Sequence, residues 1–178
     1  MMDDVRKKLS ALLGPRGYTE DAADMAPWLT DWRGRYHGRA MAMVSPASTQ
    51  QVVQIVQICA AHRIPIVPQG GNSGMVAGAT PDDTGAALLL SLRRMDAIGM
   101  DRIDEGLAVC EAGVILQTLH EALAARGRRF PLTLGGKGSA TVGGLVSTNA
   151  GGTQVLRHGT MRTLVAGLEA VMADGSVI

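Results

Sequence analysis

Two glycine-rich segments hold the residues of this chain that are best suited to chemistry. The first spans residues 67–78 (VPQGGNSGMVAG) and has four glycines in twelve residues. The second spans residues 134–152 (LGGKGSATVGGLVSTNAGG) and has seven glycines in nineteen residues. Glycine lacks a Cβ, so a ligand can approach successive main-chain N–H groups, and arrays of such groups bind anions. Two such segments suggest one large, negatively charged ligand held at two places, and a dinucleotide is the natural candidate.

The first segment directly follows a predicted strand. Ligands of open α/β sheets bind outside the carboxyl ends of strands. We therefore expect the N–H groups of Gly70, Gly71 and Gly74 to wrap a pyrophosphate, with side-chain donors from Asn72 and Ser73. The alternative is a tight surface turn.

The second segment mixes glycine with polar and apolar side chains. Four apolar residues would anchor it as a loop: Leu134, Val142, Leu145 and Val146. Hydroxyl and amide groups come from Ser139, Thr141, Ser147, Thr148 and Asn149. The alternative is a flexible linker, although linkers lack this mixture of side chains.

Several familiar motifs are absent from the sequence. Residues 136–141 (GKGSAT) end on Thr where a dinucleotide fingerprint has its third Gly or Ala, and Pro131 stands where a phosphate-binding P-loop needs its first Gly. There is no Gly-x-Ser-x-Gly hydrolase motif. The four histidines have no metal-site spacing, so we expect no metal.

A few isolated residues allow two interpretations each. His158 could act near a ligand or be a satisfied loop or helix-capping histidine. Arg157 and Arg162 could neutralise phosphate or face water. Cys59 and Cys110 are far apart in sequence, and we interpret them as two buried reduced thiols.

The composition limits the possible classes of protein. The 178 residues are 46% hydrophobic but only 3% aromatic, so the core must be aliphatic. The net charge of +1 gives no reason to expect a nucleic acid partner. No apolar run approaches the ~20 residues of a membrane span, and the N-terminus lacks the apolar stretch of a secretory signal. We therefore expect a cytoplasmic location.

The periodicity predicts a β-α-β order in the first half. Val5, Leu9, Leu12 and Leu13 share one helical face, and Gly14-Pro15 ends that helix. Residues 16–38 are expected to be irregular. Strands are predicted at residues 40–44, 64–67 and 86–92, with a helix after Ser48 in a capping-box pattern with Gln51. This order suggests a small parallel sheet with a right-handed crossover.

The second half predicts a different arrangement. Strands are expected at residues 98–103, 107–114 and 164–172, and a helix carries Leu116, Leu119 and Leu123. Asp174-Gly175 is a strong hairpin turn signal. A hairpin whose second arm has three residues predicts that this is an N-terminal piece of a longer protein; a short natural chain is the alternative.

The combined motifs resemble those of the FAD-linked oxidase family related to vanillyl-alcohol oxidase. Residues 67–74 resemble its first flavin loop, and residues 138–144 with 147–152 resemble its second. Residues 157–159 (RHG) and 171–175 (VMADG) match further landmarks in order. Residues 29–34 (LTDWRG) are most similar to the branch of D-2-hydroxyglutarate dehydrogenase, D-lactate dehydrogenase and the D-type subunit of glycolate oxidase.

The resemblance implies an α+β, PCMH-type FAD-binding domain of two α/β lobes, the second truncated at the C-terminus. The implied parts are residues 1–38 as a lead-in, 39–97 as the first lobe and 98–178 as the incomplete second lobe. The implied FAD contacts are Pro68, Gln69, Gly70, Gly71, Asn72, Ser73, Gly74, Leu134, Gly135, Gly138, Ser139, Thr141, Gly144, Thr148, Asn149 and Gly151. Asn72 and Ser73 stand where members with covalent flavin often have His, so we expect non-covalent FAD.

The resemblance also implies a reaction, in which a 2-hydroxy acid loses a hydride to flavin N5 and becomes a 2-keto acid. The substrate-binding cap, which supplies the base in this branch, would lie beyond residue 178, so no catalytic residue is assigned and the chain alone is expected to be inactive. The electron acceptor stays open. The alternatives are a redox-neutral transferase of the alkylglycerone-phosphate synthase type, or a cofactor-free fragment whose exposed apolar surface favours a homodimer.

Overall fold

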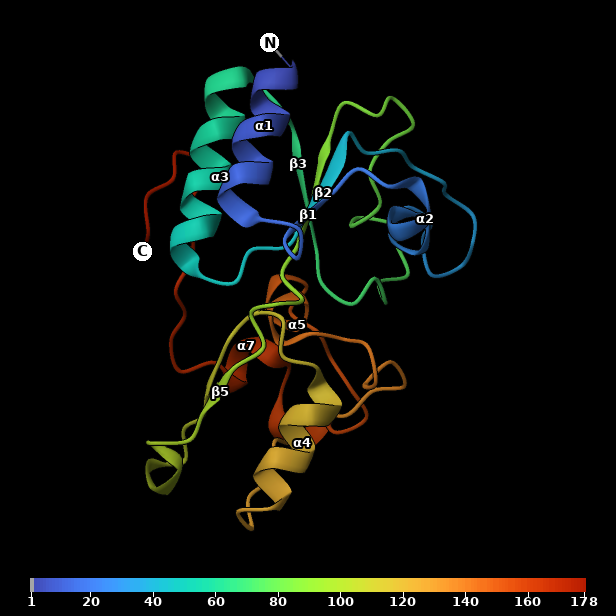
Figure 1. The fold of residues 1–178 in the computed structure, drawn as a ribbon. Helices are drawn as coiled ribbons and strands as arrows, with labels where there is room; N and C mark the ends of the chain where they lie inside the picture. The colour runs from blue at the N-terminus through green and yellow to red at the C-terminus, as the bar shows by residue number, and fades with distance from the viewer. Residues whose placement is uncertain (1) are drawn as a thin grey trace. The chain divides into compact units, whose positions relative to one another are not determined.

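The computed structural model describes residues 2–178, which form two compact units (Figure 1). The first unit contains the chain up to Arg94 together with Glu169–Ile178. The second unit contains Met95–Leu168. Each glycine-rich segment lies within one unit, the first segment in the first unit and the second segment in the second.

The first unit is built on a four-stranded sheet in the order β1-β2-β4-β3. Its strands are β1 (Tyr18–Thr19), β2 (Ala42–Val44), β3 (Ile66–Gln69) and β4 (Leu88–Ser91). β4 pairs in parallel with both β2 and β3, and β1 pairs antiparallel with β2. All four side chains of β4 are buried, as a central parallel strand requires. The predicted parallel β-α-β sheet is therefore confirmed, with the third predicted strand inserted between the other two.

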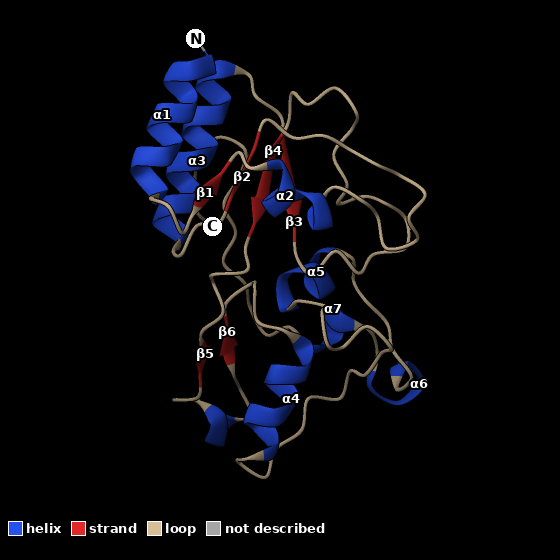
Figure 2. Cartoon of the chain, turned by 45° about the vertical axis from the view of Figure 1, so that its right-hand side comes forward, coloured by secondary structure: helices blue, strands red, loops and turns tan. Residues whose placement is uncertain are grey.

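Two long helices of this unit, α1 (Met2–Leu13) and α3 (Thr49–His62), lie side by side (Figure 2). α1 buries Val5, Leu9 and Leu13, whose spacing of four residues places them on one face. Ser48 caps α3 by accepting the Gln51 N–H, and the Gln51 side chain in turn accepts the Ala47 N–H. Both helices follow the sequence predictions.

The stretch expected to be irregular, residues 16–38, contains β1 and two short helices. These are α2 (Ala22–Met25) and the 3₁₀ helix η1 (Ala26–Trp28). Asp21 caps α2 by accepting the N–H groups of Ala23 and Asp24. A two-residue strand and single-turn helices are too short to show a periodic pattern, which is why the sequence did not predict them.

The second unit has little sheet and several short helices. Its strands β5 (Ile98–Gly99) and β6 (Val109–Cys110) pair antiparallel. Its helices are η2 (Ile103–Glu105), α4 (Leu116–Ala124), α5 (Val142–Ser147), α6 (Val155–His158) and α7 (Met161–Leu164). α4 buries Leu116, Leu119 and Leu123, as predicted.

The strands predicted at residues 98–103 and 107–114 are wrong in extent, because each is only two residues long. The chain leaves β5 into η2, and Gly106 then turns it back at φ 79°. The strand predicted at residues 164–172 is also wrong. Leu164, the first residue of that range, is the last residue of the helix α7. The only strand-like pairing described in the range is the isolated bridge between Val171 and Val177.

The predicted turn at Asp174-Gly175 is confirmed. Gly175 has φ 84°, and the Asp174 carboxylate accepts the Ser176 N–H. Ala170 and Ile178 exchange both backbone hydrogen bonds at the open end of this turn. The whole chain is of the α+β type, and none of the helices between residues 2 and 178 combines the length and hydrophobicity that a bilayer crossing requires.

Candidate functional site

The first glycine segment leaves the sheet at the carboxyl end of β3, an outer strand of the four. Gln69, the last residue of β3, is 2% exposed. Its Nε2 donates to the Trp28 carbonyl at 2.9 Å and to the Ala79 carbonyl at 2.8 Å. The Gln69 side chain therefore closes the loop formed by residues 70–78, since it ties the start of the loop to its end.

Asn72 gives this loop its shape. Its φ of 50° is in the left-handed region, which Asn tolerates better than most residues. The side-chain Nδ2 donates to the Thr30 carbonyl at 2.8 Å. The Asn72 amide thus faces the protein, and the main chain of residue 72 is what the loop offers to a ligand.

The main chain of the loop is rich in free donors. Across the described residues 2–178, no protein acceptor receives a hydrogen bond from the N–H groups of residues 70–79. A Cβ placed on Gly74 would meet nothing within 4 Å, so space for a ligand adjoins the backbone there. Consecutive free N–H groups beside open space suit a phosphate group. The loop therefore fits the pyrophosphate of FAD.

The second glycine segment is partly helical, which corrects its prediction as a loop. Thr141 is buried and caps α5 by accepting the Gly144 N–H. Gly143 packs against Ala112, where a Cβ would come within 2.7 Å of the Ala112 side chain. A Cβ on Gly152 would collide with the Thr133 carbonyl. Positions 143 and 152 therefore require glycine because the close packing there leaves no room for a Cβ.

The polar side chains of this segment make bonds within the unit. The Ser147 and Thr148 hydroxyls donate to the carbonyls of Gly143 and Gly144, and Asn149 Oδ1 accepts the Arg162 N–H. The Ser139 hydroxyl donates to the Gly136 carbonyl. The N–H groups of residues 134–136, 138, 151 and 152 donate to no acceptor among residues 2–178. Ligand contacts in this segment would therefore come chiefly from its main chain.

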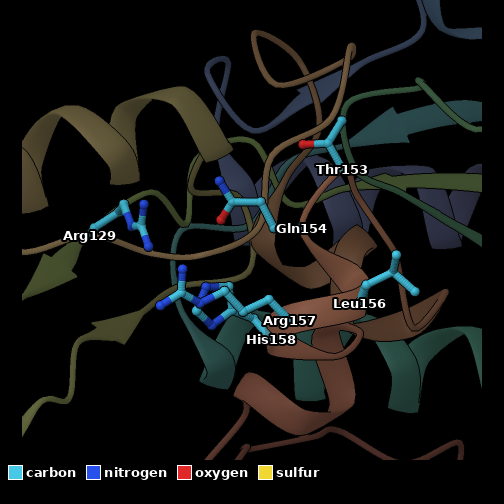
Figure 3. Close-up of a pocket in the computed structure, with 6 residues that line it drawn as sticks. All are labelled: Arg129, Thr153, Gln154, Leu156, Arg157 and His158. Atoms are coloured by element: carbon cyan, nitrogen blue, oxygen red, sulfur yellow. The ribbon is translucent and has the colours of Figure 1, made fainter.

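A pocket of about 270 Å³ lies in the second unit, beside α6 (Figure 3). The ends of Arg129, Gln154 and Arg157 point into the same space, whereas Leu156 points away. No carboxylate lines the pocket, whose residues are Arg129, Thr153, Gln154, Leu156, Arg157 and His158. The structure thus brings Arg157 and His158 together with Arg129, which the sequence did not single out because it lies 28 residues before Arg157.

The two cysteines are free thiols, Cys59 buried and Cys110 half-buried. Burial raises the pKa of Cys59 to about 11, so its thiol is protonated and unreactive at neutral pH. No cluster of three His, Cys, Asp or Glu side chains suited to a metal occurs in the described part of the chain. The free N–H groups of the two glycine segments, one segment in each unit, make these segments the candidates for ligand contacts.

Comparisons with known proteins identify the family of this chain. Residues 40–178 match the family described as "FAD binding domain". The chain is 41% identical over 170 residues to the mitochondrial D-2-hydroxyglutarate dehydrogenase of Arabidopsis thaliana, covering 94% of this chain and 30% of that protein. It is 40% identical over 160 residues to the mitochondrial D-2-hydroxyglutarate dehydrogenase of Bos taurus, covering 89% and 29%.

A solved structure of alkyldihydroxyacetonephosphate synthase has the same fold. The TM-score is 0.89 at 19% identity, covering 99% of this chain and 34% of that one. At this identity the likeness shows the fold alone. This chain spans about 30% of the length of the curated relatives named above.

The names of the relatives correct one expectation. Both are mitochondrial proteins, which contradicts the cytoplasmic location expected from the sequence. That expectation depended on the absence of an apolar stretch at the N-terminus. This absence argues only against a secretory signal, because mitochondrial transit peptides are amphipathic and rich in Arg and Ser instead. The family match over residues 40–178 shows that this chain belongs to the FAD-binding domain family and that FAD is its cofactor.

Proposed function

We propose that this chain is the FAD-holding part of an oxidoreductase that converts a D-2-hydroxy acid into the 2-keto acid. The observation that carries the proposal is the run of free N–H groups at residues 70–79, at the carboxyl end of β3, in a chain of the FAD-binding family. The chemistry that FAD supplies when bound is acceptance of a hydride. The two units would be the two flavin-binding lobes, with bounds that differ from those predicted, because residues 169–178, predicted in the second lobe, belong to the first unit.

The residues of this chain would bind and orient FAD. The N–H groups of residues 70–74 would hold the phosphates, and the free N–H groups of residues 134–136, 138 and 151–152 would make further contacts. Thr141, Thr148 and Asn149 would act by fixing the backbone, since their side chains already bond within the protein. Gln69 would do the same through its Nε2, while its buried Oε1 has no partner among the described residues. No residue of this chain is assigned as the catalytic base.

The relatives favour D-2-hydroxyglutarate as the substrate class, because both named relatives are D-2-hydroxyglutarate dehydrogenases. We expect the visible flavin absorption of the FAD-loaded full-length oxidoreductase, of which this chain would be the FAD-holding part, to bleach when D-2-hydroxyglutarate is added without oxygen. The L-enantiomer is the control and should leave the spectrum unchanged, while D-lactate and glycolate test the breadth of the class. Equal bleaching by both enantiomers, or none with any 2-hydroxy acid, would contradict the proposal.

A redox-neutral transferase is the second candidate, because the alkyldihydroxyacetonephosphate synthase structure shares the fold. The sequence identity of 19% to that protein, against about 40% to the dehydrogenases, favours oxidation. The same anaerobic experiment separates them. A transferase would leave the flavin oxidised after many turnovers, whereas a dehydrogenase without an electron acceptor would leave it reduced.

We also propose that FAD is held without a covalent bond. The loop carries Asn72 and Ser73 and has no His, Cys or Tyr between residues 67 and 78 to form such a bond. Denaturing the FAD-loaded protein in acid and removing the precipitate should therefore leave all the yellow flavin in solution. Flavin that stays with the precipitated protein would show a covalent link and contradict this proposal.

A further inference from the structure

A tight turn at residues 29–38 lies against the first glycine segment, and we name it the Asp31 turn. Asp31 is 5% exposed, although it carries a carboxylate. Its carboxylate accepts three backbone N–H groups: Arg33 at 3.1 Å, Arg35 at 2.6 Å and Tyr36 at 2.7 Å. The Asp31 N–H donates to the Tyr36 carbonyl at 3.0 Å. One side chain thus closes the whole turn.

The charge of Asp31 suits this arrangement. Backbone hydrogen bonds, led by that of Tyr36, hold the pKa of Asp31 below its ordinary value, so the group is ionised at neutral pH. A carboxylate has only acceptor oxygens and can receive all three N–H groups. An Asn at this position would keep the acceptor for Arg35 and Tyr36 but would present its NH₂ group to the Arg33 N–H.

The Asp31 turn is bonded to the glycine segment at one end and packs against the residues that follow the segment at the other. The Thr30 carbonyl, one residue before Asp31, accepts the Asn72 amide at 2.8 Å. At the far side of the turn, Gly38 packs so closely on Pro81 that a Cβ would collide with the Pro81 carbonyl. The left-handed φ of Asn72 is therefore supported by a carbonyl whose position depends on the Asp31 turn.

We propose that Asp31 is a positioning residue for FAD: by closing the turn it fixes the Thr30 carbonyl, which holds Asn72 and so aims the N–H groups of residues 70–74 at the phosphates. The inference rests on the proposed function, because it needs FAD on this loop. Asp31 itself touches no ligand. Its effect would pass chiefly through the bond between Thr30 and Asn72, since the other side-chain link from the turn to the segment is the weak one from Arg33 to the Met75 sulfur at 3.6 Å. This makes the effect separable from a general role in stability.

A double-mutant cycle on the purified protein tests the inference, with the FAD dissociation constant as the readout. Asp31→Asn and Asn72→Gly are each expected to weaken FAD binding about tenfold, since each loses roughly one charge-assisted or preorganising hydrogen bond. Gly accepts the left-handed φ but cannot donate to Thr30. Asp31→Ala should weaken binding more than Asp31→Asn, which keeps one acceptor; if Asp31→Ala does not fold, the other two variants still carry the test.

The decisive result is whether the effects of the two substitutions on the free energy of FAD binding add in the double variant. In the Asn72→Gly background, Asp31→Asn should have little further effect on FAD affinity, because residues that act through one bond do not add. Asp83→Asn is the control, an exposed acid in the same unit outside both loops, and should bind FAD normally. If the two effects multiply, Asp31 is only a general stabiliser and the inference is wrong.

Two other outcomes separate this inference from the proposed function. If wild-type protein binds FAD and Asp31→Asn binds it equally well, the inference falls and the proposed function stands. If wild-type protein binds no FAD under any condition, the assignment of the loop falls and the inference falls with it.

Discussion

Replacing Gly74 by valine is expected to weaken FAD binding about a hundredfold, or ~3 kcal/mol, while leaving the fold intact. A Cβ on Gly74 meets no protein atom within 4 Å, and the φ of this residue is outside the left-handed range, so valine fits the free protein. The added side chain would instead fill the space next to the free N–H groups, which the phosphates need. Titration of the unloaded protein with FAD measures the change.

Gly78→Val is the matched control for this variant. Gly78 also has nothing within 4 Å of its Cβ position, and it lies in the turn in which the Thr80 N–H bonds to the Ala77 carbonyl, further from β3. It should lower FAD affinity by less than about threefold, or ~0.6 kcal/mol. If both variants lose affinity equally, the phosphates are not centred on residues 70–74.

The second large effect concerns stability. Gly152→Ala is expected to destabilise the second unit by about 2–3 kcal/mol, because the new Cβ would force the backbone away from the Thr133 carbonyl. The same carbonyl accepts the Thr153 N–H at 2.9 Å, so moving it also strains that hydrogen bond. Thermal unfolding should show a decrease of roughly 10–20 °C in the Tm of this unit.

Gly135→Ala is the control for the stability prediction. It lies in the same glycine segment, but its Cβ position is empty within 4 Å. Unfolding of this variant should match that of wild type to within about 0.5 kcal/mol, as for most surface substitutions. Equal destabilisation by both changes would show that the segment needs flexible glycine throughout, contrary to the close packing at Gly152.

The two pairs of variants depend on contacts of individual glycines, which the number of glycines in each segment does not reveal. The sequence singled out both segments because glycine-rich stretches after strands suit phosphate. It could not separate Gly74 and Gly135, which adjoin open space, from Gly143 and Gly152, which touch Ala112 and Thr133. Those contacts join residues about 20 to 30 positions apart, and no local pattern encodes them.

The elements with a strong period were predictable. α1 and α3 have apolar residues on one face and clear end signals, and β4 is a short run of buried aliphatic residues. The second unit was harder to predict, because its strands are two residues long and α5 contains two glycines that disfavour a helix. Capping by Thr141 and packing on Ala112 outweigh that propensity.

The candidate site was predictable in its residues but not in their roles. Asn72 was expected to offer its side chain to the ligand, and the structure shows that side chain bonded to Thr30. The sequence singled out residues 29–34 only by their similarity to a branch of the family and did not predict the Asp31 turn. Its carboxylate accepts from residues two to five positions ahead, a local arrangement that gives no hydrophobic period.

Whether residues 70–74 hold the FAD phosphates is tested most directly by comparing FAD with riboflavin, which has the same flavin ring but no phosphate. Isothermal titration of wild-type protein and Gly74→Val with both ligands gives four dissociation constants. If the loop at residues 70–74 holds the phosphates, wild type should prefer FAD over riboflavin by at least about a hundredfold, and Gly74→Val should lose most of that preference while its riboflavin affinity is unchanged. If Gly74→Val kept the full preference for FAD, the phosphates would not be held by residues 70–74.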